Sequence, residues 1–478
     1  MRITHLLARA NRVLCLLPQC RRAMSLLRRL PRAVQQRRTR HDGWALLVLV
    51  TASALAQPKG ATSDASPTEG FSLGVQATSV IQQHSRFRAL YSGQNSLSPI
   101  GRTEETTDVT LFLGRRLGER TELWINPEID QGFGFNNTLG VAGFPSGEAY
   151  KVGQNRPYLR LHRAFIRHTI SLGGDDSQVD AATNQLPLRT TSDNLVLTIG
   201  KFSAVDLFDT NRYAHDPRAD FLNWSIIDAG AFDYGADSWG YTFGAAAEWN
   251  RGSWTLRSGL FQLPAVPNGK VAGFHPQRHM IALEAERQNT FSELPGKIKL
   301  LAFVNRAPMG NYDDAVALAV KNAAVPDTGL VRRFQSRAGL AFNLEQKLAS
   351  SVGMFARASL NDGSKEAYAF TEINRSIAAG VSVQGSSWQR KDDTIGVAGV
   401  VNGLSGSARR YFAGGGLGIL IGDGQLSYAP ERIFEAYYSA RLLPTVTATA
   451  DFQNIAHPGY NSDRGPVKVF SVRLHVEF

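Results

Sequence analysis

The segment from Lys201 to Trp239 holds the densest set of side chains that could bind a polar ligand. Seven Asp residues lie in it beside basic residues such as Arg212 and Arg218, with aromatic residues spread among them. Only one Pro and two Gly precede Trp239, so we expect an ordered loop despite its length. Long ordered loops are usually functional. The sequence therefore predicts that this segment contacts a ligand.

Motifs of common catalytic centres do not support an enzyme. The chain has neither the H-E-x-x-H zinc-protease motif nor the G-x-x-x-x-G-K-[ST] loop that binds phosphates. His162 and His168 lie six residues apart in a strand-like run, and we expect them to share a face at a lumen or its rim. The only cysteines are Cys15 and Cys20, so the rest of the chain lacks thiolate chemistry. We expect no enzyme activity and no cofactor.

Alternation of apolar and polar residues dominates the chain after residue 56 and indicates strands. No apolar run there reaches the roughly eighteen residues of a membrane-spanning helix. At 239–249 the apolar face begins with Trp239 and ends with Trp249, as in lipid-facing strands with aromatic girdles. The clearest alternating segments are 71–78, 239–249, 334–345, 445–453 and 470–478.

These segments predict an all-β fold, a transmembrane antiparallel β-barrel of about sixteen strands. The alternating segments number about sixteen to seventeen, and an even number is expected for such barrels. A closed barrel pairs all backbone groups within the protein, which a lipid environment demands. Sixteen strands would enclose an aqueous lumen.

Short and long connections alternate along this pattern, as in outer-membrane barrels. Tight turns are expected at 116–120, 294–296 and 348–350. Long loops, external or folded inward, are expected at 130–157, 203–236, 307–333 and 403–430. A short helix over 313–324 is expected in the third of them.

The C-terminal segment alternates up to its last residue. Its apolar positions run from Phe470 through every second residue to Phe478. A last strand that ends in an aromatic residue resembles the signal read by the barrel assembly machinery of outer membranes. We therefore expect that machinery, and the outer-membrane lipid, as partners of this chain.

The first 56 residues carry almost all of the net charge of +11. They contain 11 Arg and one acidic residue, Asp42, whereas the remaining 422 residues hold 41 basic and 40 acidic side chains. A basic face for nucleic acid therefore has no support in the body of the chain. Ala45–Ala56 follows an Arg-rich stretch and ends in a small-x-small site, which is typical of a secretory signal. We expect a leader over 1–56, with Met1 or Met24 as its start, and a flexible mature N-terminus over 57–70.

Two long segments carry a family resemblance. Residues 126–153 (NPEIDQGFGFNNTLGVAGFPSGEAYKVG) and 200–244 (GKFSAVDLFDTNRYAHDPRADFLNWSIIDAGAFDYGADSWGYTFG) resemble the OprB family of carbohydrate-selective outer-membrane porins. The similarity covers about residue 71 to the end. It implies a sixteen-stranded barrel over 71–478 in the outer membrane of a Gram-negative bacterium. It also implies inward loops that narrow the channel with charged and aromatic side chains.

Sugars would fit such a constriction because their hydroxyls suit Asp and Arg side chains and their apolar ring faces suit aromatic rings. We expect the solute to be a small sugar or another hydrophilic molecule. The candidate constriction residues are Asp209, Arg212, Asp216, Arg218, Asp220 and Trp224, with Glu128 and Asp130 as second choices.

A divalent-cation channel is the alternative, since some relatives of the family are described as manganese porins. Hard oxygen and imidazole ligands suit such ions. The neighbouring Arg212 and Arg218 disfavour a cation site. A barrel plugged by its own loops would conduct nothing. The ligands available for a cation in this segment are Asp206, Asp209, His215, Asp216 and Asp220.

Overall fold

The computed structural model describes residues 70–149, 153–271, 273–370 and 372–478. The expected leader (1–56) and, apart from Gly70, the expected N-terminal segment (57–70) lie outside these residues, so both stay predictions. Within the described part of the chain, no helix combines the length and the apolar character needed to cross a bilayer.

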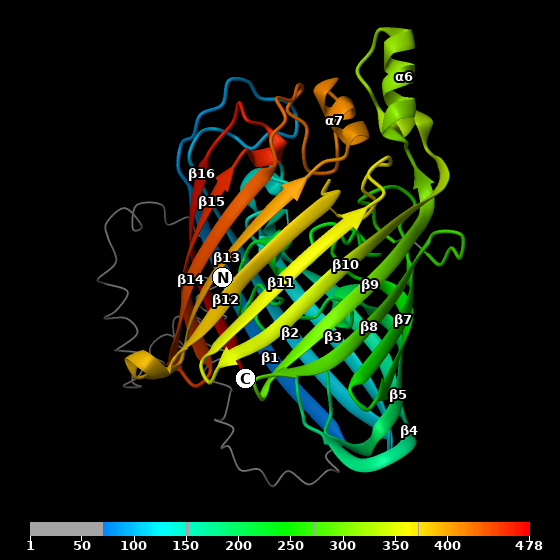
Figure 1. The fold of residues 1–478 in the computed structure, drawn as a ribbon, viewed down its shortest axis with the longest axis vertical. Helices are drawn as coiled ribbons and strands as arrows, with labels where there is room; N and C mark the ends of the chain where they lie inside the picture. Colours follow the sequence, from blue (N-terminus) through cyan, green and yellow to red (C-terminus); the bar gives the residue numbers. More distant parts are fainter. Residues whose placement is uncertain (1–69, 150–152, 272, 371) are drawn as a thin grey trace, which may run out of the picture. The chain divides into compact units, whose positions relative to one another are not determined.

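Sixteen antiparallel strands form a closed barrel in which every strand pairs with its neighbours in sequence, and β1 pairs with β16 to close it (Figure 1). The predicted fold and strand number are confirmed. The strands are β1 (Phe71–His84), β2 (Arg102–Gly118), β3 (Thr121–Gly132), β4 (Gln154–Val179), β5 (Leu188–Phe202), β6 (Thr242–Arg251), β7 (Trp254–Gln262), β8 (His279–Phe291), β9 (Leu294–Met309), β10 (Arg333–Ala349), β11 (Val352–Asn361), β12 (Arg375–Gly385), β13 (Arg390–Gly403), β14 (Glu431–Leu443), β15 (Val446–Ala456) and β16 (Val467–Glu477).

Short helices lie only in the connections of the described chain. The α-helices are α5 (Trp224–Ile227), α6 (Tyr312–Asn322) and α7 (Gly406–Ala413), and the 3-10 helices are η1 (Phe135–Asn137), η2 (Gly147–Ala149), η3 (Ala204–Asp206), η4 (Thr328–Val331), η5 (Ser386–Trp388) and η6 (Pro458–Tyr460). The predicted loop helix is α6, which begins one residue and ends two residues before its expected bounds.

Strand β10 shows how alternation sets the two faces of the wall. Phe334 and Leu340 point outward and are 47% and 56% exposed, whereas Arg337 and Asn343 point inward and are buried. The outward row is apolar and the inward row is polar, which matches a wall between lipid and a polar interior. Strand β16 follows the same rule, with Phe470 outward and Arg473 inward.

Phe478 extends the ladder beyond β16. Its backbone N–H donates to the carbonyl of Val75 at 2.9 Å, and its own carbonyl accepts from the N–H of Val75 at 3.2 Å. The last residue therefore helps to close the barrel against β1. Recognition of this end by the assembly machinery stays a prediction.

The connections divide into a short-turn rim and a long-loop rim. Five connections at the short-turn rim contain two residues and one contains four, at 119–120, 252–253, 292–293, 350–351, 386–389 and 444–445. The β4–β5 connection (180–187) is longer. At the other rim, the expected long loops are found at 133–153, 203–241, 310–332 and 404–430. The turn expected at 294–296 lies two residues earlier, because β9 already begins at Leu294.

Trp239 does not belong to the lipid-facing girdle that its sequence pattern indicated. Strand β6 begins only at Thr242, and the guanidinium carbon of Arg160 lies 3.2 Å from the centroid of the Trp239 ring. Tyr241 stacks on His162 with 4.3 Å between ring centroids. These interior contacts hold the chain inside the barrel for three residues longer than alternation suggested. Trp249 remains outward and 39% exposed.

His162 and His168 do not share a face, contrary to the expectation. Asn126 pairs with Arg163 whereas Pro127 pairs with Leu161, so His162 is the extra residue of a β-bulge. Pro127 lacks the N–H that a regular ladder would use at this point. A bulge shifts the alternation by one residue, so His162 points inward and His168 is exposed.

Candidate functional site

The β5–β6 loop (203–241) folds into the barrel and is fixed there by buried polar side chains. The Asp209 carboxylate is 1% exposed and accepts hydrogen bonds from Asn343 Nδ2 at 2.6 Å and from the Ala229 N–H at 2.6 Å. The Arg357 guanidinium donates to it at 3.1 Å. Asn343 and Arg357 come from β10 and β11, so this carboxylate ties the loop to the wall.

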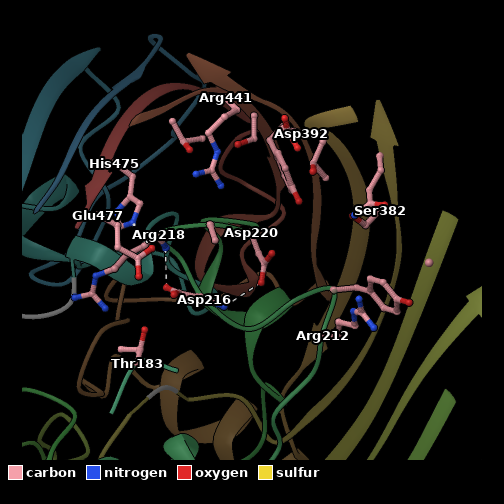
Figure 2. A pocket seen from close by; sticks show the side chains of 18 of the residues that line it. Thr183, Arg212, Asp216, Arg218, Asp220, Ser382, Asp392, Arg441, His475 and Glu477 are labelled. Carbon is pink, nitrogen blue, oxygen red and sulfur yellow. Dashed lines mark hydrogen bonds and ion pairs between the residues drawn. The ribbon is translucent and has the colours of Figure 1, made fainter. Parts of the chain in front are cut away.

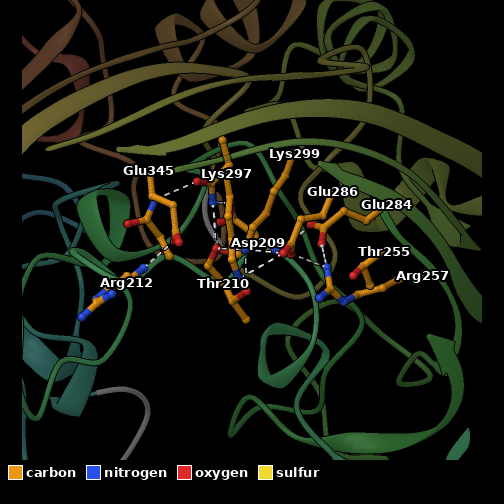
Figure 3. Close-up of polar contacts among 12 residues, drawn as sticks. Asp209, Thr210, Arg212, Thr255, Arg257, Glu284, Glu286, Lys297, Lys299 and Glu345 are labelled. Carbon is orange, nitrogen blue, oxygen red and sulfur yellow. Dashed lines mark hydrogen bonds and ion pairs between the residues drawn. The ribbon is translucent and has the colours of Figure 1, made fainter. Parts of the chain in front are cut away.

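Strand carboxylates also hold the loop backbone near Asp209 (Figure 3). Glu284 accepts a hydrogen bond from the N–H of Asp209, and Glu345 accepts one from the N–H of Arg212, both at 2.8 Å. Lys299 donates to the Thr210 hydroxyl at 2.6 Å. The contact with Glu345 engages only the backbone of Arg212, so it does not fix the direction of the Arg212 side chain.

A second anchor comes from β16. The Arg473 guanidinium donates to the carbonyls of Pro217, Ala219 and Asp220 at 2.5, 3.0 and 2.8 Å. A guanidinium can satisfy several carbonyls at once because its donors lie in one rigid plane. The turn around Asp220 is therefore held against the last strand.

Trp224, at the start of α5, belongs to a buried aromatic stack. Its ring lies 5.4 Å from that of Phe144 and 5.5 Å from that of Phe370, and it is 3% exposed. This stack joins three different loops inside the barrel. Trp224 therefore packs on protein and has no face toward a solute.

Arg218 lies among three carboxylates that come from other elements. Its guanidinium is 3.5 Å from Asp108 on β2, 3.6 Å from Glu128 on β3 and 3.5 Å from Glu148 in η2. Asp216 accepts a hydrogen bond from the Arg218 N–H at 2.9 Å. One loop cation thus compensates two charges from adjacent strands and one from another loop.

Glu128, Asp130 and His162 form the one group in the described chain with a geometry that could hold a metal ion. Nδ1 of His162 lies 3.2 Å from Glu128, and Nε2 lies 3.6 Å from Asp130. Their potential ligand atoms all lie within 4.8 Å of one another. Arg160 approaches Asp130 at 3.8 Å, and with Arg218 it brings two positive charges to the same carboxylates.

A cavity of about 450 Å³ opens on the short-turn side of this loop. Four of the predicted site residues line it together, namely Arg212, Asp216, Arg218 and Asp220. Figure 2 shows them around one space with residues of the short-turn rim and the last strands. The rim and last-strand residues labelled there are Thr183, Ser382, Asp392, Arg441, His475 and Glu477.

The sequence pattern of one protein family, described as "Carbohydrate-selective porin, OprB family", matches residues 94–478. The chain belongs to the OprB family. An OprB-family porin is a channel of the outer membrane through which small solutes pass. No curated protein sequence is significantly similar to this porin.

Solved structures share the fold of this porin. A high-pH structure of Pseudomonas putida OprB aligns with a TM-score of 0.64 at 15% identity and covers 86% of this chain and 94% of that chain. DcaP, an outer-membrane channel of Acinetobacter baumannii, aligns with a TM-score of 0.47 at 12% identity and covers 85% and 97%. The first of these similarities supports the sixteen-stranded porin fold.

The spacing G-x-S-x-G does occur in this porin, at Gly70–Gly74. Ser72, however, lies inside β1. A nucleophile elbow needs a sharp turn between a strand and a helix. The spacing therefore marks no catalytic serine.

The acidic residues that line the cavity differ in their electrostatics. Burial raises the pKa of Asp220 to about 6, and the negative charge of Asp216 adds to this effect. Burial opposes the ionisation of Asp216, but the pKa of Asp216 is lowered, chiefly because the charge of Arg218 and a hydrogen bond from the Arg218 N–H act together against it. Near neutral pH the loop therefore presents one firmly charged carboxylate and one that titrates to the cavity.

The predicted site residues separate into three groups. Arg212, Asp216, Arg218 and Asp220 line the cavity, and Glu128 and Asp130 lie in the wall, where Arg218 contacts Glu128. Asp209 and Trp224 are buried supports. Sequence reasoning missed Arg357, Arg473 and Glu148 as partners of the loop. Each is distant in sequence and has no local motif, so only alternation, which places Arg357 and Arg473 inward, could have drawn attention to them.

Proposed function

We propose that this porin conducts small neutral hydrophilic solutes, sugars among them, past the inward loop. The observation that supports this best is the cavity beside Arg212, Asp216, Arg218 and Asp220, which presents charges of both signs. Its volume of about 450 Å³ lies in the range of small-molecule sites, roughly 300–1,000 Å³.

The chemistry of the lining suits hydroxyl groups. A guanidinium donates in pairs, and a carboxylate accepts in pairs, so neighbouring hydroxyls of a sugar can bind both. In the described chain, no ion pair or side-chain hydrogen bond engages the exposed Arg212 guanidinium. Tyr213 and Tyr437 also line the cavity and offer the aromatic faces expected of Trp224. Several weak contacts of this kind let a solute enter and leave.

The test is single-channel conductance of the refolded porin with and without sugars, in the wild type and in Arg218→Ala. The substitution leaves the carboxylates of Asp108, Glu128 and Glu148 without their cation. We expect sugar block to weaken about tenfold or more, since one charged hydrogen bond contributes roughly 1.5–3 kcal/mol. We also expect a stronger preference for cations.

Arg102→Ala is the matched control, because the Arg102 side chain is 49% exposed at the long-loop end of β2 and Glu104 is its only ion-pair partner among the described residues. It should conduct and be blocked like the wild type. Unchanged block and selectivity in Arg218→Ala would refute the assignment of this residue to the solute path.

Passage of divalent cations is the second candidate, and the group of Glu128, Asp130 and His162 favours it. Carboxylate oxygens and an imidazole suit manganese. The adjacent Arg160 and Arg218 argue against it, because they already neutralise these carboxylates. Manganese uptake into liposomes, compared with swelling in sugar, separates the two functions. His162→Ala should reduce uptake only if cations are the true solute.

A further inference from the structure

The β4–β5 hairpin differs from the other connections at its rim. Its connection spans 180–187, which is eight residues, whereas the other six contain two to four. Strand β4 is 26 residues long, and its pairing with β5 is irregular around Gly173 and Gly174, whose φ values are +119° and +87°. Figure 1 shows the teal end of this hairpin beyond the neighbouring turns. The long connection and the irregular pairing of β4 with β5 thus allow this end of the hairpin to bend.

The tip of the hairpin, residues 180–187, folds back against the inner face of the barrel. Leu186 is 4% exposed and its N–H donates to Glu122 at 2.8 Å. Arg167 donates to Glu122 at 2.8 Å and to the carbonyl of Asn184 at 2.7 Å. Asn126 donates to the side-chain oxygen of Asn184, also at 2.8 Å. Three hydrogen bonds to β3 and β4 therefore fix the tip in place, and the bond between Arg167 and Glu122 holds two of the partners together.

Apolar packing secures the same position. Leu186 belongs to the buried cluster that contains Trp124 and Phe165 from the neighbouring strands. Arg116 on β2 adds a hydrogen bond to the carbonyl of Pro187. A buried leucine contributes roughly 1.5–3 kcal/mol. The inward position of the tip is thus well determined.

The fixed tip presents neutral polar groups to the cavity. Thr183 and Asn184 line the same space as Asp216 and Arg218 of the inward loop, and Figure 2 shows Thr183 beside that loop. A hydroxyl and an amide both donate and accept hydrogen bonds without charge. Such groups can bind a sugar hydroxyl without adding a charge to the site.

We propose that the hairpin tip is one wall of a binding site for small neutral polyhydroxylated solutes at the short-turn mouth of the channel. Thr183 and Asn184 contact the solute from the tip, while Arg212, Asp216 and Arg218 contact it from the loop. The proposal rests on the proposed function and adds a determinant of selectivity that lies outside the inward loop. If the hairpin had only a structural role, changes at its tip would not alter sugar block, and sugar would not protect the tip from modification.

Cysteine labelling tests this directly, because the chain contains no cysteine after Cys20. Thr183→Cys would be reacted with a bulky methanethiosulfonate in the refolded porin. Ala181→Cys is the matched control, since Ala181 is exposed on the same tip but does not line the cavity. We expect modification at 183 to lower ion conductance about twofold or more and to weaken block by glucose and sucrose, because channel selectivity follows pore width and lining. Modification at 181 should do neither.

Protection of the cysteine from modification by bound sugar is a second measurement, and it does not depend on recording ion currents. Glucose or sucrose at high concentration should slow modification at 183, measured by mass spectrometry, and leave the rate at 181 unchanged. Asn184→Ala should also reduce sugar block, because it removes an amide that lines the cavity. If modification at 183 changes neither conductance nor block, and sugar does not protect it, the hairpin site is refuted. If the wild type shows no sugar block but modification at 183 still lowers ion conductance, the proposed function fails while the tip is still in the conducting path.

Discussion

At the scale of residues, most charged groups inside the barrel hold the loops and few are free to meet a solute. Asp209 and Arg357 are both 1% exposed and face each other at 3.1 Å. Burying an isolated charge is very unfavourable, so charges are retained in such an interior only in compensated sets. The charged groups that line the cavity, Arg212 and Asp220 among them, are therefore the candidates for contact with a solute.

Asp220 predicts a dependence of ion selectivity on pH. Because burial raises its pKa to about 6, the carboxyl is mostly neutral at pH 5 and mostly charged at pH 7. The cavity gains a negative charge as the pH rises through about 6, so cation over anion permeability should increase. Reversal potentials in a salt gradient measure this ratio. Asp220→Asn should remove this part of the change, and the same pH response in that variant would exclude Asp220 as its source.

At the scale of elements, the inward loop depends on strand side chains for its position. Asp209→Ala removes the acceptor shared by Arg357, Asn343 and the N–H of Ala229. Breaking a buried ion pair by removing one partner costs roughly 3–5 kcal/mol. We expect faster hydrogen exchange over 203–241 and a noisier, larger conductance, with the barrel intact.

Asp392→Ala is the matched control, because Asp392 is exposed and lines the cavity without anchoring the loop. Its exchange over 203–241 should equal that of the wild type. Equal protection in Asp209→Ala would show that other contacts fix the loop without this carboxylate.

Elements with simple alternation could be predicted from sequence, and those shaped by distant contacts could not. Strand β10 follows its expected faces from Phe334 to Glu345. The start of β6 could not be placed because Arg160, on another strand, holds Trp239 inside. The inward and outward positions along β4 are exchanged at a bulge opposite Pro127. The alternation of residues in the sequence does not reveal such a bulge.

The candidate site was predicted as a segment, and the roles of its residues were only partly foreseen. Asp209 and Asp220 look alike in sequence, yet one faces Arg357 and the other lines the cavity. Their difference arises from barrel closure, which brings β10, β11 and β16 to the loop. Such information is not contained in the local spacing of residues 203–241.

At the scale of the whole molecule, the apolar outer face defines where the barrel can tolerate charge. Leu340 lies near the middle of β10, points outward and is 56% exposed. Leu340→Lys should destabilise the lipid-embedded barrel by about 2–4 kcal/mol, the cost of a basic residue near the bilayer midplane. Denaturant unfolding in lipid vesicles measures this difference.

Leu330→Lys is the control, because Leu330 is 71% exposed in η4, within the 310–332 connection of the long-loop rim. Water reaches that position, so stability should change by less than about 0.5 kcal/mol. A similar loss in both variants would argue against a lipid-facing wall at Leu340.

The tethers of the inward loop also link its inward position to closure of the barrel. The loop lies between β5 and β6, but Arg357, Glu435 and Arg473, which bind it, come from β11, β14 and β16. A partial sheet that contains β5 and β6 without these three strands cannot form those contacts. The loop therefore gains its full set of tethers only when the wall is closed around it.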